Sequence, residues 1–271
     1  MLLGGLLGAT LVRLSPGYGV EENELNSRLS RESVEALRAA HAQDASIPRF
    51  YLAYLSRLAH GDLGQSATLD EPVTQLLAER LPETLKSVAI GLGLGWALGL
   101  ALALAAVASR GAANAAASAA AAALLSVPTA VMALLLVMAR APGRLAIGLI
   151  VFPKIFQYAR NLLLRCAAMP HVLTARAKGL GGARILFRHI LPVAGAQLLA
   201  LAGVSVSMAF AAAIPVEAVC DLPGIGQLAW KAAMGRDLVL LVDLTMLVTL
   251  VTLAANMAGE LVAQPGRTGE A

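Results

Sequence analysis

The stretch SVAIGLGLGWALGLALALAAVAS, from Ser87 to Ser109, decides the fold class, because it contains no charged side chain. A helix needs roughly 20 apolar residues to cross the hydrocarbon core of a bilayer. Helices and closed barrels are the structures that satisfy every backbone hydrogen bond there. The stretch therefore predicts a transmembrane helix. The whole chain agrees, since 58% of its 271 residues are hydrophobic and 14% are charged, whereas soluble domains carry about 25% charged residues.

Three further segments are similarly apolar and predict membrane spans. Ala112–Ala139 has no charge and carries Pro128 near its middle, which predicts a kinked helix. Val193–Val216 is a third span, and Leu238–Gly259, interrupted only by Asp243, is a fourth. Asp243 lies about two turns into its span, so it belongs either at the membrane interface, which we favour, or on a translocation path.

A fifth segment, Leu145–Ala168, is long enough to span but carries three cations. At about 100° per residue, Lys154 and Arg165 share a helix face, while Arg160 points elsewhere. A buried Lys154 would have to face the interior of the helix bundle or a water-filled cavity.

The ends of the chain flank these spans. Residues 1–12, MLLGGLLGATLV, are too short to span and lack the basic start of a signal peptide. We expect a truncated first transmembrane helix there, followed by an extracytoplasmic segment, 13–86, with a short helix capped by Ser30. The expected architecture is all-α and polytopic, with five to six transmembrane helices. Its membrane domain covers 87–264, with a cytoplasmic loop at 169–192, and a cytoplasmic tail covers 265–271.

Lys and Arg in short loops set the orientation of a membrane protein. The loop before Val193 carries four of them and no acid, which predicts that it is cytoplasmic. Segment 13–86 then lies outside, and Arg140 and Arg144 also fall outside, against the rule. We therefore expect a multi-pass protein of the bacterial inner membrane, in contact with lipid.

Small residues recur on one face of the first clear span. Gly91, Gly95 and Gly99 are spaced by four residues, a pattern that lets two helices approach closely in a membrane. Glycine is also common in membrane helices in general, so the spacing alone leaves both interpretations open. We favour a packing seam.

No pattern in the sequence indicates catalysis. The four His residues are isolated, without metal-ligand spacing, and Cys166 and Cys220 are far apart. The chain also lacks the GxxxxGK[ST] phosphate loop. We therefore predict no enzyme activity, no cofactor, no metal site and no nucleic-acid partner.

The stretch TARAKGLGGARILFRHILP, from Thr174 to Pro192, is purely basic between two apolar spans. One interpretation is that its charges only fix the topology. That interpretation does not account for the small residues between the charges, or for Gly179 and the Leu191-Pro192 pair at a set distance.

This pattern resembles the cytoplasmic coupling loop of ABC importer permeases. The loop of that family has a short Ala-rich helix, then a Gly, then Leu-Pro twelve and thirteen residues later; Gly179 and Leu191-Pro192 keep this spacing. Other motifs similar to the dipeptide, oligopeptide and nickel branch follow in order along the chain. They are HGDLGQS at 60–66, PVTQLLAERLPETL at 72–85, TARAKGL at 174–180, EAVCDLPGIGQLAWKAAMGRD at 217–237, Asn256 with Glu260, and QPGR at 264–267.

The resemblance implies a transport subunit that hydrolyses no ATP itself. Two permease subunits would form the pathway for peptides or similar small solutes, and separate cytoplasmic ABC ATPase subunits would drive it. An extracytoplasmic solute-binding protein would dock on segment 13–86 and on the external loop at Pro223–Gly226. The residues implied in ATPase coupling are Ala175, Arg176, Ala177, Lys178, Gly179, Leu180, Leu191 and Pro192, and those implied in the external gate loop are Pro223, Gly224 and Gly226.

The chain also departs from the family pattern. PGYG at 16–19 stands where the family usually has Pro-Gly-Asp-Pro, and MPHVL at 169–173 replaces acidic and aromatic residues. An alternative is therefore a degenerate permease paralogue with a structural or regulatory role in a membrane assembly. A channel or ion carrier is less favoured, because the spans lack rings of charge or a broken-helix ion site.

Overall fold

The computed structural model describes residues 10, 56–58, 60–108 and 112–263. The expected first helix (apart from Thr10), the Ser30 helix and the C-terminal tail lie outside these ranges. The chain divides into two compact units, of which one contains the residues up to Arg80 together with Leu228–Leu250. The other contains Leu81–Gln227 and the residues from Val251 onward.

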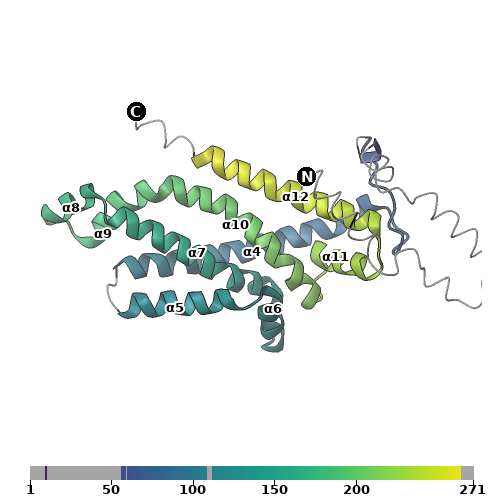
Figure 1. The fold of residues 1–271 in the computed structure, drawn as a ribbon, viewed down its shortest axis with the longest axis horizontal. Coiled ribbons are helices and arrows are strands. Elements are labelled where there is room, and N and C mark those ends of the chain that lie inside the picture. Colours follow the sequence, from purple (N-terminus) through teal and green to yellow (C-terminus); the bar gives the residue numbers. More distant parts are fainter. Residues whose placement is uncertain (1–9, 11–55, 59, 109–111, 264–271) are drawn as a thin grey trace, which may run out of the picture. The chain divides into compact units, whose positions relative to one another are not determined.

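The described residues confirm the predicted all-α fold (Figure 1), because the only bridge between extended segments is the isolated pair Gln65–Pro72. A short π-helical segment, Leu186–Ile190, leads directly into one of the long helices. The α-helices are α4 (Val73–Ala108), α5 (Ala112–Ser126), α6 (Thr129–Met138), α7 (Gly143–Ala167), α8 (Pro170–Ala177), α9 (Gly182–Ile185), α10 (Leu191–Val219), α11 (Ile225–Met234) and α12 (Leu238–Ala263).

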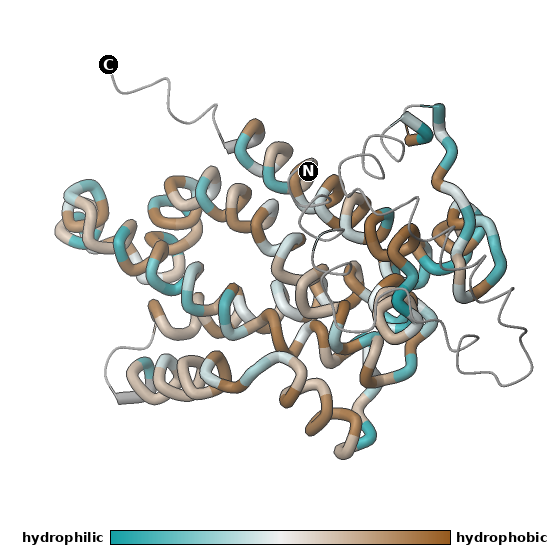
Figure 2. Tube along the Cα trace, turned by 45° about the vertical axis from the view of Figure 1, so that its right-hand side comes forward, coloured by the Kyte–Doolittle hydropathy of each residue, from teal (hydrophilic) through white to brown (hydrophobic). Residues whose placement is uncertain are grey.

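Four helical segments in the described part are long and apolar enough to cross a membrane, which confirms a polytopic protein. They are Val73–Ala108, Gly143–Ala167, Gly182–Val219 and Leu238–Leu261. The first begins well before Ser87, so the end of the expected extracytoplasmic segment is helical and continuous with the span. Hydrophobic residues dominate the helices in Figure 2, with hydrophilic residues returning along part of α7.

The expected kink at Pro128 is a much sharper break. The axes of α5 and α6 differ by 99°, so the two helices form either one broken span or a re-entrant loop. Pro128 adopts an extended conformation with ψ of 140°. Proline lacks the amide hydrogen of a helix interior and disfavours a helical conformation at the residue before it, Val127. These two effects end α5 and allow α6 to start in a new direction.

Helix α7 has a central place in the packing of the second unit. It contacts α5, α6 and α10, and in Figure 1 it runs between α10 and α5. Its buried side chains, which include Ile147, Ile155, Phe156 and Leu163, belong to the two apolar clusters that form the core. Lys154 is exposed, so the bundle interior that we considered for it is not where its side chain lies.

The glycines of α4 lie against α7. A Cβ added at Gly91 would lie 2.6 Å from Cγ2 of Ile147, and one at Gly99 would lie 2.9 Å from Cγ2 of Ile155. At Gly95 the nearest atom, the Gly148 carbonyl oxygen, would be 3.5 Å away, an ordinary contact. Two of the three glycines are therefore needed for the close approach of α4 and α7.

A second close approach, between α10 and α12, had no signal in the glycine spacing. A Cβ added at Gly203 would lie 2.8 Å from the Cα atom of Gly259, and a Cβ added at Gly259 would lie 2.8 Å from the Cα atom of Gly203. Close by, the Ser207 hydroxyl donates to the Asn256 side-chain oxygen at 3.1 Å. Small residues and a polar contact together hold these two helices, which is how membrane helices commonly associate.

Candidate functional site

The basic stretch folds as a short helix that ends in a glycine turn. Pro170 starts α8, where its missing N–H costs no hydrogen bond. Gly179 follows the helix with φ of 75°, and its N–H donates to the Arg176 carbonyl at 2.9 Å. Glycine is the residue that adopts this left-handed conformation without a steric penalty. The position of Gly179 thus fixes where α8 stops.

One face of α8 is anchored in the core. Val172 and Ala175 are buried, in one apolar cluster with Leu163 and Cys166 of α7. Ala175 is therefore occupied within the chain and is not a small residue presented to a partner. The other residues singled out in the sequence lie differently: Arg176, Ala177, Lys178, Gly179 and Pro192 are exposed, and Leu180 and Leu191 are half-buried.

The path from Gly179 to α10 is almost continuously helical. Helix α9 leads into the π-helical segment Leu186–Ile190, and Pro192 stands in the first turn of α10. The Nε2 atom of His171 on α8 lies 3.1 Å from the carbonyl oxygen of His189 in the π segment. The side chain of His171, which looked isolated in the sequence, thus joins the two ends of the loop through the backbone of His189.

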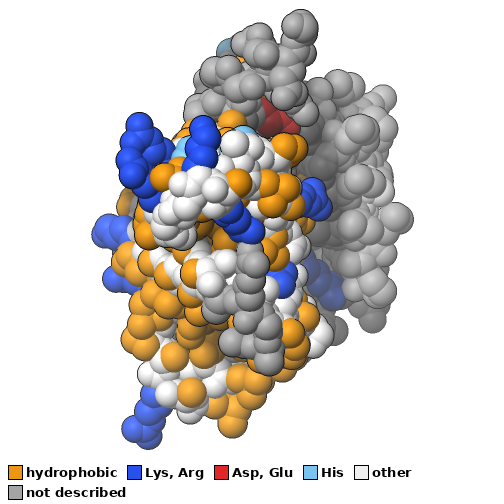
Figure 3. Space-filling view, turned by 90° about the vertical axis from the view of Figure 1, so that its left-hand side faces the viewer, with side chains coloured by type: hydrophobic (Ala, Val, Ile, Leu, Met, Phe, Trp, Pro, Cys, Tyr) orange, Lys and Arg blue, Asp and Glu red, His pale blue; other side chains and the backbone are white. Residues whose placement is uncertain are grey.

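The outer side of this loop combines cations with apolar side chains. Leu173 and Phe187 are 58% and 61% exposed, respectively. Figure 3 views the molecule from the end that carries α8 and α9, and Lys and Arg side chains stand there among hydrophobic ones. Sequence reasoning found the cations but missed the two large apolar residues. We call this set the coupling surface: Leu173, Arg176, Lys178, Arg184, Phe187 and Arg188, all of them exposed.

The loop after α10 is held by a buried carboxylate. Glu217 is 1% exposed, and its Oε2 atom accepts hydrogen bonds from the Gly226 N–H at 2.7 Å and from the Thr84 hydroxyl at 3.1 Å. The Thr84 oxygen in turn accepts from the N–H of Ile225 at 2.7 Å. A Cβ at Gly224 would lie 2.3 Å from the Glu217 carboxylate, so this glycine leaves room for it. Sequence reasoning selected the glycines but not Glu217.

Two motifs that stand far apart in the sequence meet at Asp237. The Oδ1 atom of Asp237 accepts from the N–H of Leu240 at 3.0 Å and so caps the start of α12. Its Oδ2 atom accepts from the hydroxyls of Ser66 at 2.6 Å and of Thr68 at 3.1 Å. A Cβ at Gly235 would lie 2.3 Å from Thr68. This network ties the HGDLGQS segment to the GRD segment.

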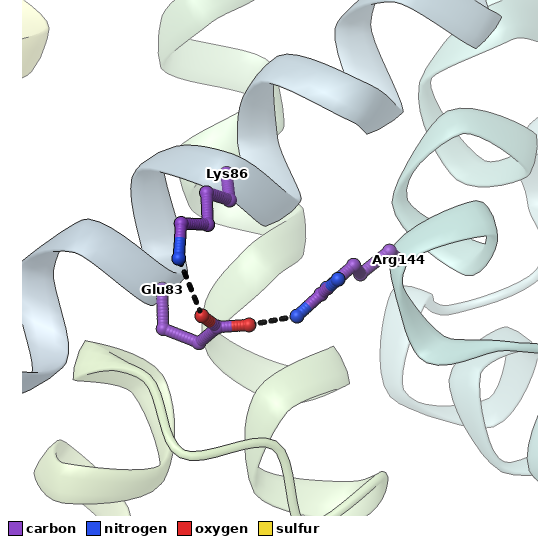
Figure 4. A network of polar contacts seen from close by, with 3 residues as sticks. All are labelled: Glu83, Lys86 and Arg144. Carbon is purple, nitrogen blue, oxygen red and sulfur yellow. Dashed lines mark hydrogen bonds and ion pairs between the residues drawn. The ribbon is translucent and has the colours of Figure 1, made fainter.

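Arg144, which the orientation expected from the sequence places outside, against the positive-inside rule, has an acidic partner. Figure 4 shows its guanidinium on the carboxylate of Glu83, which also accepts from Lys86 at 3.5 Å. Glu83 belongs to α4 and Arg144 to the first turn of α7. The pair therefore neutralises a cation at the point where these two helices come together.

The described residues contain no group of three or more His, Cys, Asp or Glu side chains that could hold a metal ion. Their polar networks join helices and loops to each other. The chain thus has several apolar spans, and specific hydrogen bonds hold the short loops between them. These features define a polytopic helical membrane protein.

Comparison with known proteins agrees with this class. The family model for the binding-protein-dependent transport system inner membrane component matches residues 78–264, and the chain belongs to that family. It is 29% identical over 260 residues to the oligopeptide transport system permease protein OppB of Salmonella typhimurium, over 88% of this chain and 84% of that protein. OppB of Escherichia coli matches with the same identity and coverage. The chain is thus a membrane-spanning transport component, as the resemblance implied.

Proposed function

We propose that this chain is the permease subunit of an ATP-driven importer for peptides or similar small solutes. It forms half of the translocation pathway, and a second permease subunit forms the other half. The oligopeptide permeases among its relatives support the substrate class. The observation that carries the mechanism is the coupling surface, a cationic and apolar face on a short helix that is anchored in the transmembrane core.

The proposed partner at this surface is a cytoplasmic ABC ATPase, which hydrolyses ATP in place of this chain. Exposed Arg176 and Lys178 can pair with acidic groups on the rim of a groove, which steers association and fixes orientation. Exposed Leu173 and Phe187 can fill apolar pockets within that groove, as large buried side chains do at protein interfaces. The surface offers both kinds of contact within a few turns of helix.

Movement of α8 would reach the membrane spans through its packing. Val172 and Ala175 fix it to the buried cluster that includes Leu163 of α7. On the other side, the π-helical segment runs without a break into α10. Closure of the ATPases on ATP would therefore move α7 and α10 together with α8, which is the mechanical requirement for alternating access.

The external end of the pathway would involve the loop that contains Pro223, Gly224 and Gly226. A solute-binding protein would dock there and on segment 13–86. The hydrogen bonds from Gly226 and Thr84 to Glu217 support a loop of defined shape. A loop of defined shape can be recognised by a partner and can transmit a conformational change to α10, which carries Glu217.

Co-purification in mild detergent tests the coupling role. The native chain should bring down the ATPase and a second permease, whereas Gly179→Asp should lose only the ATPase. The matched control is Gly181→Asp, because Gly181 is equally exposed and open but has φ of −64°. Loss with Gly179→Asp alone identifies the turn as the critical feature, and loss with both identifies the charge of the surface. If no ATPase accompanies the native chain even on co-expression, the degenerate-paralogue alternative replaces this proposal.

A further inference from the structure

The exposed face of α7 differs from the exposed faces of the other spans. From Ala146 to Ala167, the exposed positions of α7 are Lys154, Tyr158, Asn161 and Arg165. They recur at intervals of four, three and four residues, so they form one stripe along the helix. We call them the α7 stripe. Every member is polar, although α7 is long and apolar enough to cross a membrane.

Helix α12 provides the contrast within the same unit. From Leu253 to Leu261 its large exposed side chains are Leu253, Met257 and Leu261, which follow a similar helical spacing and are apolar, and Glu260, the one exposed charge of this stretch, which lies in the last turn of the helix. Such a face suits contact with lipid tails. The α7 stripe does not, because a Lys or Arg side chain is costly to place at the centre of a bilayer.

Lys154 lies too far from the ends of α7 for its ammonium group to reach the membrane surface. It is close to the middle of α7, about 16 Å from the start of the helix and about 20 Å from its end at 1.5 Å per residue. A lysine side chain can extend to the interface only from positions near a helix end. Arg165, in the last turn, could do so, but Lys154 could not. The Lys154 end of the stripe, at the middle of the helix, therefore needs water or a polar partner.

No acid in the described part of the chain supplies that partner. The sequence contains no Asp or Glu between Glu83 and Glu217, and the ion pairs found near the start of α7 are those of Glu83 with Lys86 and Arg144, away from the stripe. Asn161 accepts a hydrogen bond from Arg160, whose Nε also donates to Asn114 of α5. This contact orients the amide of the stripe but leaves the charges of Lys154 and Arg165 without a counter-charge in the described part of the chain.

We infer that the α7 stripe lines the water-filled part of the translocation pathway and favours solutes that carry a carboxylate. This inference rests on the proposed import function for its substrate and extends that function to a selectivity element. Water explains how cations are tolerated at mid-membrane, and a passing carboxylate supplies the missing negative charge. Tyr158 and Asn161 add hydrogen-bonding groups between the two cations.

The first experiment measures water access in membranes that contain the assembled transporter. In a chain with Cys166→Ala and Cys220→Ala, single cysteines are placed at Tyr158, Asn161, Leu253 or Met257. Charged, membrane-impermeant thiosulfonates are applied to membranes open on both faces. We expect the stripe cysteines to react at least tenfold faster than the α12 cysteines. Equal rates would overturn the inference, because the stripe would then face lipid or a dry interface.

The second experiment measures the local charge. One turn from Lys154, at roughly 6 Å, a unit charge in a watery environment changes the local concentration of a charged reagent about threefold. Lys154→Gln should therefore lower the ratio of anionic to cationic reagent rates at Tyr158→Cys by about tenfold. Arg140→Gln, which removes an exposed cation outside the stripe, should leave the ratio unchanged. A ratio that favours the cationic reagent in the parent would reveal acids of a partner subunit over the stripe and overturn the proposed selectivity.

The third experiment measures selectivity by uptake of a labelled peptide with a free C-terminal carboxylate and of its amidated form. We expect Lys154→Gln to reduce the preference for the free carboxylate several-fold and Lys154→Arg to retain it. An unchanged preference in Lys154→Gln would contradict the inference. If no variant imports either peptide while the stripe cysteines still react, the proposed peptide import fails and the water-filled face stands.

Discussion

Single buried polar residues fix the loops of this protein. Glu217 and Asp237 are both 1% exposed, and each accepts hydrogen bonds from two or more separate segments. A buried carboxylate is stable only when such donors surround it. The two residues therefore determine the shapes of the loops on either side of α11, and substitutions at them have specific consequences.

Gly224→Ala should destabilise the loop that follows α10. The added Cβ would lie 2.3 Å from the Glu217 carboxylate, which must then move away from the Gly226 N–H. A lost hydrogen bond to a buried charged group, together with overpacking, costs on the order of 2–4 kcal/mol. The apparent melting temperature in detergent should fall clearly. Gly181→Ala adds the same methyl group in open space and should have little effect; equal melting temperatures for the two variants would contradict this account of Glu217.

Asp237→Ala should free the segment around Ser66. It removes the cap of α12, worth about 0.5–2 kcal/mol, and the acceptor for Ser66 and Thr68, worth about 1 kcal/mol for each bond. We expect a lower melting temperature and faster proteolysis between Asp62 and Asp70. Glu71→Ala, which removes an exposed carboxylate nearby, is the control. Proteolysis at the control rate would show that Asp237 does not hold this segment.

At the scale of elements, the packing of α4 on α7 depends on two particular glycines. Gly91 and Gly99 allow Ile147 and Ile155 to approach the α4 backbone. Lipid tails are as apolar as the side chains, so the helices associate through close contact and not through a hydrophobic driving force. The Glu83–Arg144 ion pair lies between the same two helices and adds a polar contact.

Gly91→Ala should weaken this helix pair, whereas Gly93→Ala should not. A methyl group at Gly91 would lie 2.6 Å from Ile147, but one at Gly93 would meet no atom within 4 Å. Overpacking of this kind costs about 1–3 kcal/mol, while alanine in an exposed helix position is at least as favourable as glycine. The measurement is the melting temperature of each variant in detergent, compared with that of the native chain. If both variants lowered the melting temperature equally, Gly91 would not be needed for the close packing of α4 on α7.

At the scale of the whole molecule, the proposed mechanism depends on α8 moving with the membrane spans. The neighbouring residues Val172 and Leu173 separate the two functions of this helix. Val172 is fully buried and anchors α8 to the core, whereas Leu173 is 58% exposed on the coupling surface. A substitution at each should therefore fail in a different way.

Val172→Asn should retain the ATPase but reduce peptide uptake, since an unpaired buried amide loosens α8 from α7. Leu173→Asn should instead weaken ATPase binding, because it removes an apolar contact from the coupling surface. Co-purification and uptake assays in the same membranes distinguish the two defects. If both variants lose the ATPase to the same degree, α8 serves only for docking and does not transmit movement.

The amino-acid sequence by itself determined the fold class, most of the spans and the family. Uncharged segments such as Ser87–Ser109 become helices because a bilayer offers no other partner for their backbone groups. This constraint is local, so it can be read from the sequence. The motif order from HGDLGQS to the GRD segment likewise pointed to the family that the comparison identifies. The proposed role of the loop around Gly179 stays a prediction until ATPase binding is measured.

Only the tertiary structure decided which residues of these helices are buried, exposed or paired. Sequence periodicity placed Lys154 and Arg165 on one face of α7, but the packing of α5, α6 and α10 leaves that face uncovered. Likewise, Pro128 predicted a bend but not its 99°, and nothing local linked Ser66 to Asp237. Burial and pairing depend on neighbours that are distant in the sequence, so they are decided only when the helices pack.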